Sequence, residues 1–114
     1  MNGEIGHGLN RVTLVGRLGR APEMRYTPSG KPVTSFSIVT TYTWMSSNQE
    51  IQEETDWFNV VAWGSLAEAC KQSLTQGQRV YVEGRIKTRR WRDEGNVPHS
   101  SAEVVAQGVI SLNA

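Results

Sequence analysis

The chain has 114 residues, of which 38% are hydrophobic and 20% are charged. This length and composition predict one globular domain with a radius of gyration of about 13 Å and exclude a second folded domain. The longest uncharged run, residues 32–49, is rich in Thr and Ser and lacks the roughly 18 consecutive apolar residues of a membrane span. Residues 1–10 lack the basic and then apolar pattern of a secretion signal, so we expect neither secretion by that route nor a membrane partner.

Cysteine and histidine are too sparse in this chain to suggest a metal site. Cys70 is the only cysteine, and we expect it to be a small buried residue on a helix in a protein of a reducing compartment. His7 and His99 lie far apart and lack the spacing of zinc ligands. The sequence therefore predicts no metal and no cofactor.

The charges are sorted along the chain, although their sum is small. The formal net charge of +1 argues by itself against a nucleic-acid-binding domain. Residues 9–31 nevertheless hold five basic residues and one acidic residue, and residues 79–92 hold six basic residues and one acidic residue. Residues 46–70 hold five acidic residues and no basic one. One path on the surface can therefore be strongly positive while the molecule is nearly neutral.

Alternating apolar and polar residues predict the secondary structure. In chain order, the sequence predicts strands over residues 10–18, 33–44 and 55–63, a helix from Ser65 through Leu74, and strands over residues 79–92 and 101–112. We expect Gly19 to help end the first strand, and residues 45–54 and 93–98 to form polar loops. In the fourth strand, the residues that should face the core are Val80, Val82, Gly84 and Ile86.

Particular residues predict how these elements end. Ser65 and Glu68 have the spacing of a capping box at the start of the helix, and Gly77 is placed to end the helix in a left-handed conformation. Gly108 predicts a β-bulge in the last strand. Five strands with a helix between the third and fourth have the order of the OB-fold, a Greek-key barrel that binds oligonucleotides or oligosaccharides. An SH3-like barrel fits the strand pattern too, but would lack a helix at this point.

Four tryptophans carry the functional prediction, namely Trp44, Trp57, Trp63 and Trp91. Tryptophans are usually core or interface residues. Here, alternation places Trp91 on the face of its strand that carries Arg85, Lys87 and Arg89. Trp57 and Trp63 share a face with the polar Asn59. Rings interleaved with cations are suited to single-stranded nucleic acid, because unpaired bases stack on the rings while the cations follow the phosphates. The alternative for the basic run is a charged edge strand that prevents aggregation.

No motif of catalysis or of nucleotide binding is present. Gly16 and Gly19 match neither the dinucleotide-binding nor the phosphate-loop pattern, and they predict bends in a coiled barrel strand. The acidic residues beside the third predicted strand lack metal-ligand spacing, and we expect them in a solvated loop; they are Glu50, Glu53, Glu54 and Asp56. A nuclease would need paired carboxylates or a metal cluster, and a sugar-binding module would not need sorted cations. We therefore expect that the chain is not an enzyme.

Several segments resemble one known family: NRVTLVGRLG at 10–19, PEMRY at 22–26, TDWFNVVAWG at 55–64 and GQRVYVEGRIKTRRW at 77–91. Over residues 9–112 the chain is similar to the bacterial and mitochondrial single-stranded DNA-binding (SSB) proteins. The resemblance implies an OB-fold that assembles as a homotetramer and binds single-stranded DNA without sequence preference. It also implies a role in DNA replication, repair and recombination.

The resemblance also assigns site residues by position. Trp44, Trp57 and Trp91 match the base-stacking aromatic residues of the family, and Trp63 stands where another stacking aromatic residue is usual. The matching basic positions on the DNA path are Arg11, Arg25, Lys87, Arg89 and Arg90, to which strand alternation adds Arg85 as a further phosphate contact.

We expect residues 1–8 to be a flexible segment and residues 9–112 to be the DNA-binding domain. Bacterial relatives continue into an acidic tip that recruits other proteins, and nothing before Ala114 resembles that tip. The expected partners are therefore single-stranded DNA and further copies of the chain, without partners recruited by a tail. A short accessory OB-fold protein and an RNA-binding OB-fold protein are the alternatives. We expect the bacterial cytoplasm, at the nucleoid, as the location, with the mitochondrial matrix as the alternative.

Overall fold

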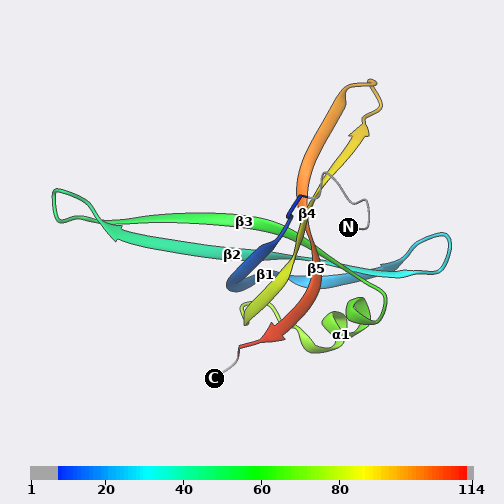
Figure 1. The fold of residues 1–114 in the computed structure, drawn as a ribbon, viewed down its shortest axis with the longest axis horizontal. Coiled ribbons are helices and arrows are strands. Elements are labelled where there is room, and N and C mark those ends of the chain that lie inside the picture. Colours follow the sequence, from blue (N-terminus) through cyan, green and yellow to red (C-terminus); the bar gives the residue numbers. More distant parts are fainter. Residues whose placement is uncertain (1–7, 113–114) are drawn as a thin grey trace, which may run out of the picture.

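Five strands close into a barrel in the order β1-β2-β3-β5-β4 in the computed structural model, which describes residues 8–112 (Figure 1). The elements in chain order are β1 (Val12–Tyr26), β2 (Pro32–Met45), β3 (Ile51–Trp63), α1 (Ser65–Ser73), β4 (Arg79–Arg92) and β5 (Pro98–Ser111). Paired strands are antiparallel except for β3 and β5, which are parallel. This strand order, with a helix between β3 and β4, is that of the OB-fold, so the predicted fold class is confirmed. The predicted flexible segment 1–8 lies outside the described residues, apart from Gly8.

The core forms because alternate residues of each strand point into the barrel. The largest fully buried apolar side chains are Leu18, Phe36, Ile38, Val60, Val80 and Val82. Helix α1 packs against β2 and β3 near one end of the barrel and buries Ala67 and Cys70 (Figure 1). The buried Thr34 hydroxyl donates to the Ala67 carbonyl at 2.7 Å and so ties β2 to the helix. Cys70 is buried on the helix as predicted, and this burial raises the pKa of its thiol to about 11.

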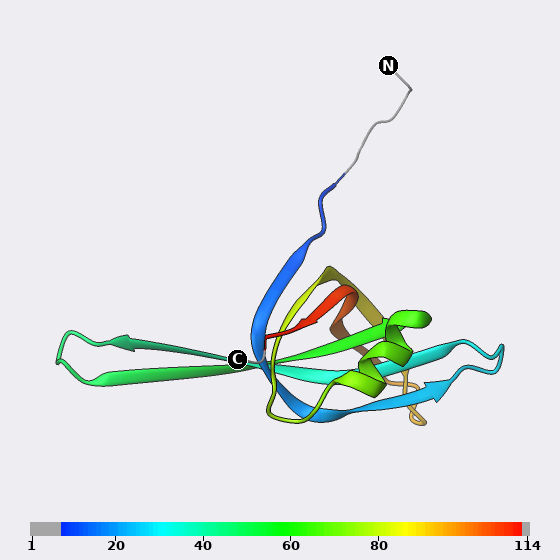
Figure 2. The same ribbon diagram turned by 90° about the horizontal axis from the view of Figure 1, so that it is seen from below.

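Three hairpins extend beyond the barrel as arms, most visibly the β2–β3 arm at the left of Figure 1 and Figure 2. The β2–β3 pairing continues without a break from Val33–Trp63 to Met45–Ile51. Half of residues 45–54 are therefore strand, and the predicted polar loop over this range was too long. The β-branched threonines of the arm suit an extended ladder, which leaves only residues 46–50 for the turn. The arms give a radius of gyration of 17.3 Å, larger than the predicted value for a compact domain.

The sequence predicted that Gly19 helps to end the first strand, but β1 does not end there. It continues to Tyr26 through two irregularities in its pairing with β2, one between Leu18 and Arg20 and one between Arg20 and Glu23. These irregularities bend the strand around the barrel without ending it. They also change which residues face outward, so that Arg20 joins the outer face although simple alternation places it with Leu18.

The ends of the helix differ from the prediction. The N-cap is Gly64 and not Ser65, and no side chain caps the helix. Gly64 has a φ of 67°, which a serine would adopt only with strain, so the chain turns sharply from β3 into α1 at this glycine. At the other end, the helix stops at Leu74, which is extended and donates its N–H to the Cys70 carbonyl. Gly77 does adopt a positive φ of 85°, but it does so in the turn that leads to β4.

The long β4–β5 hairpin explains why the prediction of Ile86 as a core residue was wrong. Pairing between β1 and β4 ends at Val12–Gly84, so Ile86 lies beyond the barrel and is 46% exposed, where the sequence predicted a core residue. The Asn10 side chain takes the place of a neighbouring strand, since it donates to and accepts from the Ile86 backbone at 2.6 and 2.8 Å. The predicted bulge is confirmed, because the pairing with β4 skips one residue of β5 immediately before Gly108. The predicted loop at 93–98 is a turn over 93–97, since Pro98 begins β5.

Candidate nucleic-acid interface

The outer face of β1, β2 and β3 places aromatic and basic side chains in rows. Each row is fixed by strand register, because residues paired across a sheet project from the same face. The rows are Trp63–Val33–Arg25, Asn59–Ser37–Arg20 and Trp57–Val39–Arg17. Phe58, Val60 and Ala62 alternate with these β3 residues and point toward the core. The predicted shared face of Trp57, Asn59 and Trp63 is therefore confirmed.

A groove of about 580 Å³ crosses this face, and we call it the basic groove. Its charged lining residues are the cations Arg20, Arg25, Lys87 and Arg89, with the single carboxylate of Glu103. Trp63, which is 46% exposed, and Asn59 line it too. The groove thus brings together four of the residues that the sequence singled out, from three different strands. It also adds Arg20, which sequence reasoning missed because strict alternation places Arg20 with Leu18, whereas the bulges of β1 shift it to the outer face.

Trp57 lies beside the groove on β3 and is 61% exposed. Its ring lies against Gly19 of β1, in the space that a side chain at this position would need. A place for Trp57 in the core does not fit this exposure. The ring can accept a stacked base on its open side.

Trp44 lies apart from the basic groove, on the β2–β3 arm. Its ring is 41% exposed and stacks on that of Tyr42, with centroids 5.6 Å apart and an interplanar angle of 28°. Alternation along β2 places these two rings on the face of the ribbon opposite to Trp57. Tyr42 was not predicted as a site residue, although its spacing of two residues from Trp44 on a strand indicates that the two rings share a face. The acidic residues predicted in a solvated loop lie on this arm and are exposed; they are Glu50, Glu53, Glu54 and Asp56.

Trp91 projects from the β4–β5 arm and is 43% exposed. Its ring stacks on that of His99, its partner in the ladder, with centroids 5.4 Å apart and an interplanar angle of 16°. The guanidinium carbon of Arg89 lies 5.5 Å from the centre of the indole, within the range of a cation–π contact. A separate hollow lies at this end of the arm, and it is lined by Arg90, Trp91, Arg92, Pro98, His99 and Ser100. Arg90 thus lies at this hollow and not in the basic groove.

Arg11 is placed differently from the other predicted phosphate contacts. Its guanidinium lies 3.4 Å from the Glu83 carboxylate, which also accepts a hydrogen bond from the Tyr81 hydroxyl at 2.9 Å. These two hydrogen bonds, that from Tyr81 first, hold the pKa of Glu83 below its usual range. Arg11 therefore belongs to the outer face of β1 and β4, outside the lining of the basic groove. Arg85 is exposed and lies in a row with Val105 of β5, also outside that lining.

Among residues 8–112, no group of three or more His, Cys, Asp or Glu side chains is placed to hold a metal ion. No helix in the described part of the chain is long and apolar enough to cross a membrane.

A closed five-stranded barrel whose outer face carries exposed indole rings among cations defines an OB-fold of the oligonucleotide-binding class. Residues 9–112 match the model of the single-strand binding protein family, and the chain belongs to this family. This confirms the resemblance seen in the sequence.

Two curated relatives are similar to this chain. It is 46% identical over 89 residues to single-stranded DNA-binding protein 1 of Chlorobaculum tepidum, covering 78% of this chain and 55% of the relative. It is 42% identical over 98 residues to the single-stranded DNA-binding protein of Neisseria meningitidis, covering 86% of this chain and 56% of the relative. The chain thus spans little more than half the length of these relatives.

Solved structures share the fold over almost the whole chain. A Plasmodium falciparum SSB in complex with single-stranded DNA superposes with a TM-score of 0.87 at 28% identity, covering 96% of this chain and 100% of that one. A deletion mutant of the Thermus aquaticus single-stranded DNA-binding protein superposes with a TM-score of 0.80 at 31% identity, covering 93% of this chain and 51% of that one.

Proposed function

We propose that the chain is a non-catalytic protein that binds single-stranded DNA without sequence preference and protects exposed strands during DNA replication, repair and recombination. The observation that carries the proposal is the basic groove, in which four cations and Trp63 meet on one face. Trp57 and Trp91 are exposed on β3 and β4, two of the strands that line the groove. The family of the chain, and the DNA complex of its Plasmodium relative, support the same function.

The proposed mechanism divides binding between two kinds of contact. Indole rings stack on unpaired bases, and each stacked base contributes about 1 to 3 kcal/mol with little dependence on its identity. Arginine and lysine neutralise phosphates, which releases counterions and makes the affinity depend on salt. Neither kind of contact reads the edge of a base, so the mechanism predicts binding without sequence preference.

One titration tests this function. Tryptophan fluorescence is followed during addition of oligo-dT, oligo-rU or duplex DNA at two salt concentrations. We expect quenching and saturation with oligo-dT, weaker binding at the higher salt concentration and no comparable response to duplex DNA. Equal or tighter binding of oligo-rU would instead support the RNA-binding alternative, and preference for the duplex would contradict the proposal.

We also propose that the chain assembles as a homotetramer. Supporting this, Val15, Tyr81 and Ile110 are paired side by side across β1, β4 and β5, and the apolar Val15 and Ile110 are exposed on that outer face. A second copy of the chain would cover this row, because exposed apolar surface favours association between proteins. Sedimentation without DNA is expected to give a tetramer, and Ile110→Asp is expected to dissociate it. A wild-type monomer at micromolar concentration would contradict this assembly.

For the location, we propose the bacterial cytoplasm at the nucleoid, which the bacterial sources of both curated relatives support. Imaging of a fluorescent fusion in a bacterial cell would test it, and a diffuse signal that ignores the nucleoid would contradict it.

A further inference from the structure

The basic groove is positive along its two sides and not between them. Its four cations come from β1 and β4, namely Arg20, Arg25, Lys87 and Arg89. The part of the lining that β2, β3 and β5 contribute includes no Lys or Arg. In the barrel order β1-β2-β3-β5-β4, these three strands lie between β1 and β4, so we call their part of the lining the groove floor.

Glu103 of β5 is the only charged residue of the groove floor. Its neighbour Val104 is buried in the core, so alternation along β5 points Glu103 outward. Asn59 and Glu103 come directly before Val60 and Val104, which are paired on the parallel strands β3 and β5. Lys87 is the partner of Glu103 across β4 and β5. One row therefore crosses the groove from cation to cation: Arg20–Ser37–Asn59–Glu103–Lys87.

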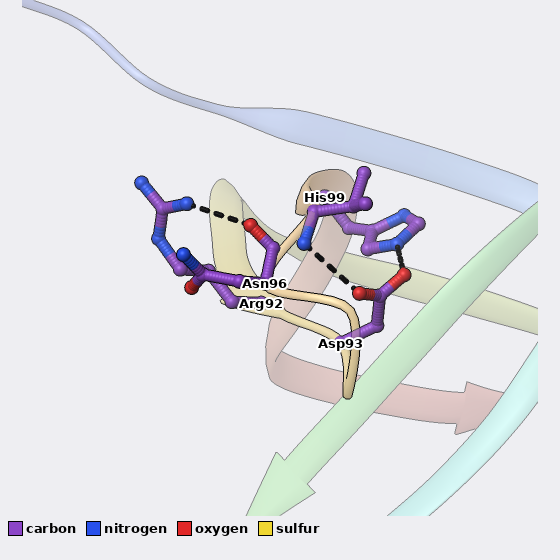
Figure 3. A network of polar contacts seen from close by, with 5 residues as sticks. Arg92, Asp93, Asn96 and His99 are labelled. Carbon is purple, nitrogen blue, oxygen red and sulfur yellow. Dashed lines mark hydrogen bonds and ion pairs between the residues drawn. The ribbon is translucent and has the colours of Figure 1, made fainter.

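Asp93, in the turn between β4 and β5, shows how a carboxylate is bound when it has a structural role (Figure 3). One of its oxygens accepts the backbone N–H of Val97 at 2.9 Å, and the other lies 2.8 Å from Nε2 of His99. Glu103, by contrast, forms no ion pair within residues 8–112. Its half-buried carboxylate therefore faces whatever enters the groove.

The charges of the groove decide which part of a nucleotide lies where. The cations at the sides attract phosphates, and the carboxylate of Glu103 repels them from the floor. Trp63, on the floor strand β3, offers a ring on which a base can stack. Between Lys87 and Glu103 the sign of the charge changes over one strand spacing, about 4.8 Å. The groove is therefore suited to a strand whose phosphates follow the sides while its bases lie on the floor.

We propose that Glu103 is a specificity-determining residue of the basic groove. Its carboxylate makes it unfavourable for a chain of phosphates to lie on the floor, whereas the four cations alone would attract any polyanion. Repulsion of the wrong ligand contributes to specificity alongside attraction of the right one. Glu103 thus selects strands with unpaired bases over polyanions without bases, such as inorganic polyphosphate. The inference rests on the proposed function and adds to it what the groove rejects.

The test compares Glu103→Gln, which keeps the size of the side chain and removes its charge, with the wild type. Labelled oligo-dT is bound to the whole chain and displaced by unlabelled oligo-dT, by an oligomer of the same length whose sugars carry no bases, or by inorganic polyphosphate. A salt concentration of about 0.15 M screens charges that lie more than about 8 Å apart.

We expect Glu103→Gln to bind the base-free oligomer and polyphosphate about two- to fivefold more tightly than the wild type, the size of one surface charge interaction. Phosphates can then lie on the floor. The affinity for oligo-dT is expected to rise less than about twofold, because a stacked base already keeps its phosphates at the sides.

Two further variants complete the design. Glu68→Gln makes the same change of charge on α1, where the side chain is exposed and outside the groove lining, and is expected to leave all three affinities unchanged. Asn59→Asp adds a second carboxylate to the floor, so it is expected to weaken binding of the base-free oligomer and of polyphosphate more than binding of oligo-dT. Thermal unfolding checks that each variant is folded.

The outcomes separate this inference from the function on which it rests. An equal rise for all three ligands in Glu103→Gln would mean that Glu103 only weakens binding in general, and no rise for any would mean that it does not face the bound chain. A loss of affinity for oligo-dC but not for oligo-dT would mean that it reads base edges. Each of these results overturns the inference alone. A wild type that fails to bind oligo-dT overturns the proposed function, and the inference with it.

Discussion

The indole ring of Trp57 occupies the space where a side chain on Gly19 would lie. A Cβ atom built on Gly19 would come within 2.5 Å of Cζ3 of Trp57. Gly19 lies on β1 and Trp57 on β3, with β2 between them, so the ring reaches across the outer face of the barrel. The glycine thus provides the surface on which a proposed base-stacking ring rests.

Gly19→Ala is therefore expected to weaken binding of oligo-dT by about 1 kcal/mol, part of the contribution of one stacked base, because the ring must move. Fluorescence titration measures the loss, and thermal unfolding checks the fold. The matched control is Gly108→Ala, since a Cβ atom at Gly108 meets nothing within 4 Å. Equal affinities of the two variants and the wild type would show that the position of the Trp57 ring does not matter for binding.

Removing a stacking ring is a more direct test. Trp57→Ala and Trp91→Ala are each expected to lose about 1 to 3 kcal/mol of binding free energy while keeping the fold, because exposed rings contribute little to core packing. As a contrast, Phe36→Ala empties a fully buried site and should lower the free energy of unfolding by about 3 to 5 kcal/mol. Chemical unfolding monitored by circular dichroism distinguishes the two cases. Unfolding of either tryptophan variant at room temperature would mean that the ring belongs to the core.

The basic groove predicts which cations contribute to salt dependence. Each phosphate neutralised on a single strand adds about −0.7 to the slope of log affinity against log salt. The double change of Lys87 and Arg89 to Ala should therefore make the slope shallower by roughly 1 to 1.5, alike for all sequences. Arg20→Ala is expected to change the slope as well.

Arg11→Ala provides the control for the groove cations, because Arg11 is paired with Glu83 outside the groove. Its slope is expected to match that of the wild type. A slope changed by Arg11→Ala and unchanged by the double variant would reverse the assignment of the DNA path. A loss confined to certain sequences would mean that Lys87 or Arg89 reads bases.

The contact between Thr34 and Ala67 predicts a change in stability alone. Thr34→Val keeps the shape of the side chain but removes the hydroxyl that donates to the Ala67 carbonyl. The expected loss is about 1 to 3 kcal/mol of unfolding free energy, measured by urea denaturation. Thr34→Ser retains the hydroxyl and should lose less. DNA affinity should be unaffected in both variants, since Thr34 points into the core.

Strict alternation made some elements predictable and others not. The bounds of β4 match the prediction, although its buried and exposed residues alternate only from Arg79 to Gly84 and the strand is exposed from Arg85 onward. The strand predicted over residues 10–18 was too short because the two bulges of β1 break the alternation. A glycine in a strand indicates a bend as readily as an end. The helix cap was misplaced because Ser65 has a suitable hydroxyl, whereas the positive φ that decides the cap belongs to Gly64.

In the candidate site, too, local alternation predicted some features, while others depend on the tertiary structure. The shared face of Trp57 and Trp63 followed from local alternation on one strand. The meeting of Arg20, Arg25 and Lys87 in one groove depends on how three strands coil around the barrel, which no local pattern encodes. The stacking of His99 on Trp91 depends on the register across the turn at 93–97. That register follows from the length of the turn, and the start of β5 was predicted at Ser101, three residues after its observed start at Pro98.

The β2–β3 arm affects how copies of the chain interact at high concentration. Beyond the barrel, this ribbon is only two strands wide, so backbone N–H and C=O groups on its outer edges are open to pairing with another chain. Residues 40–56 carry four carboxylates and no Lys or Arg. Ribbons from neighbouring molecules therefore repel one another, and this repulsion guards against edge-to-edge aggregation that the threonine-rich strands would otherwise favour.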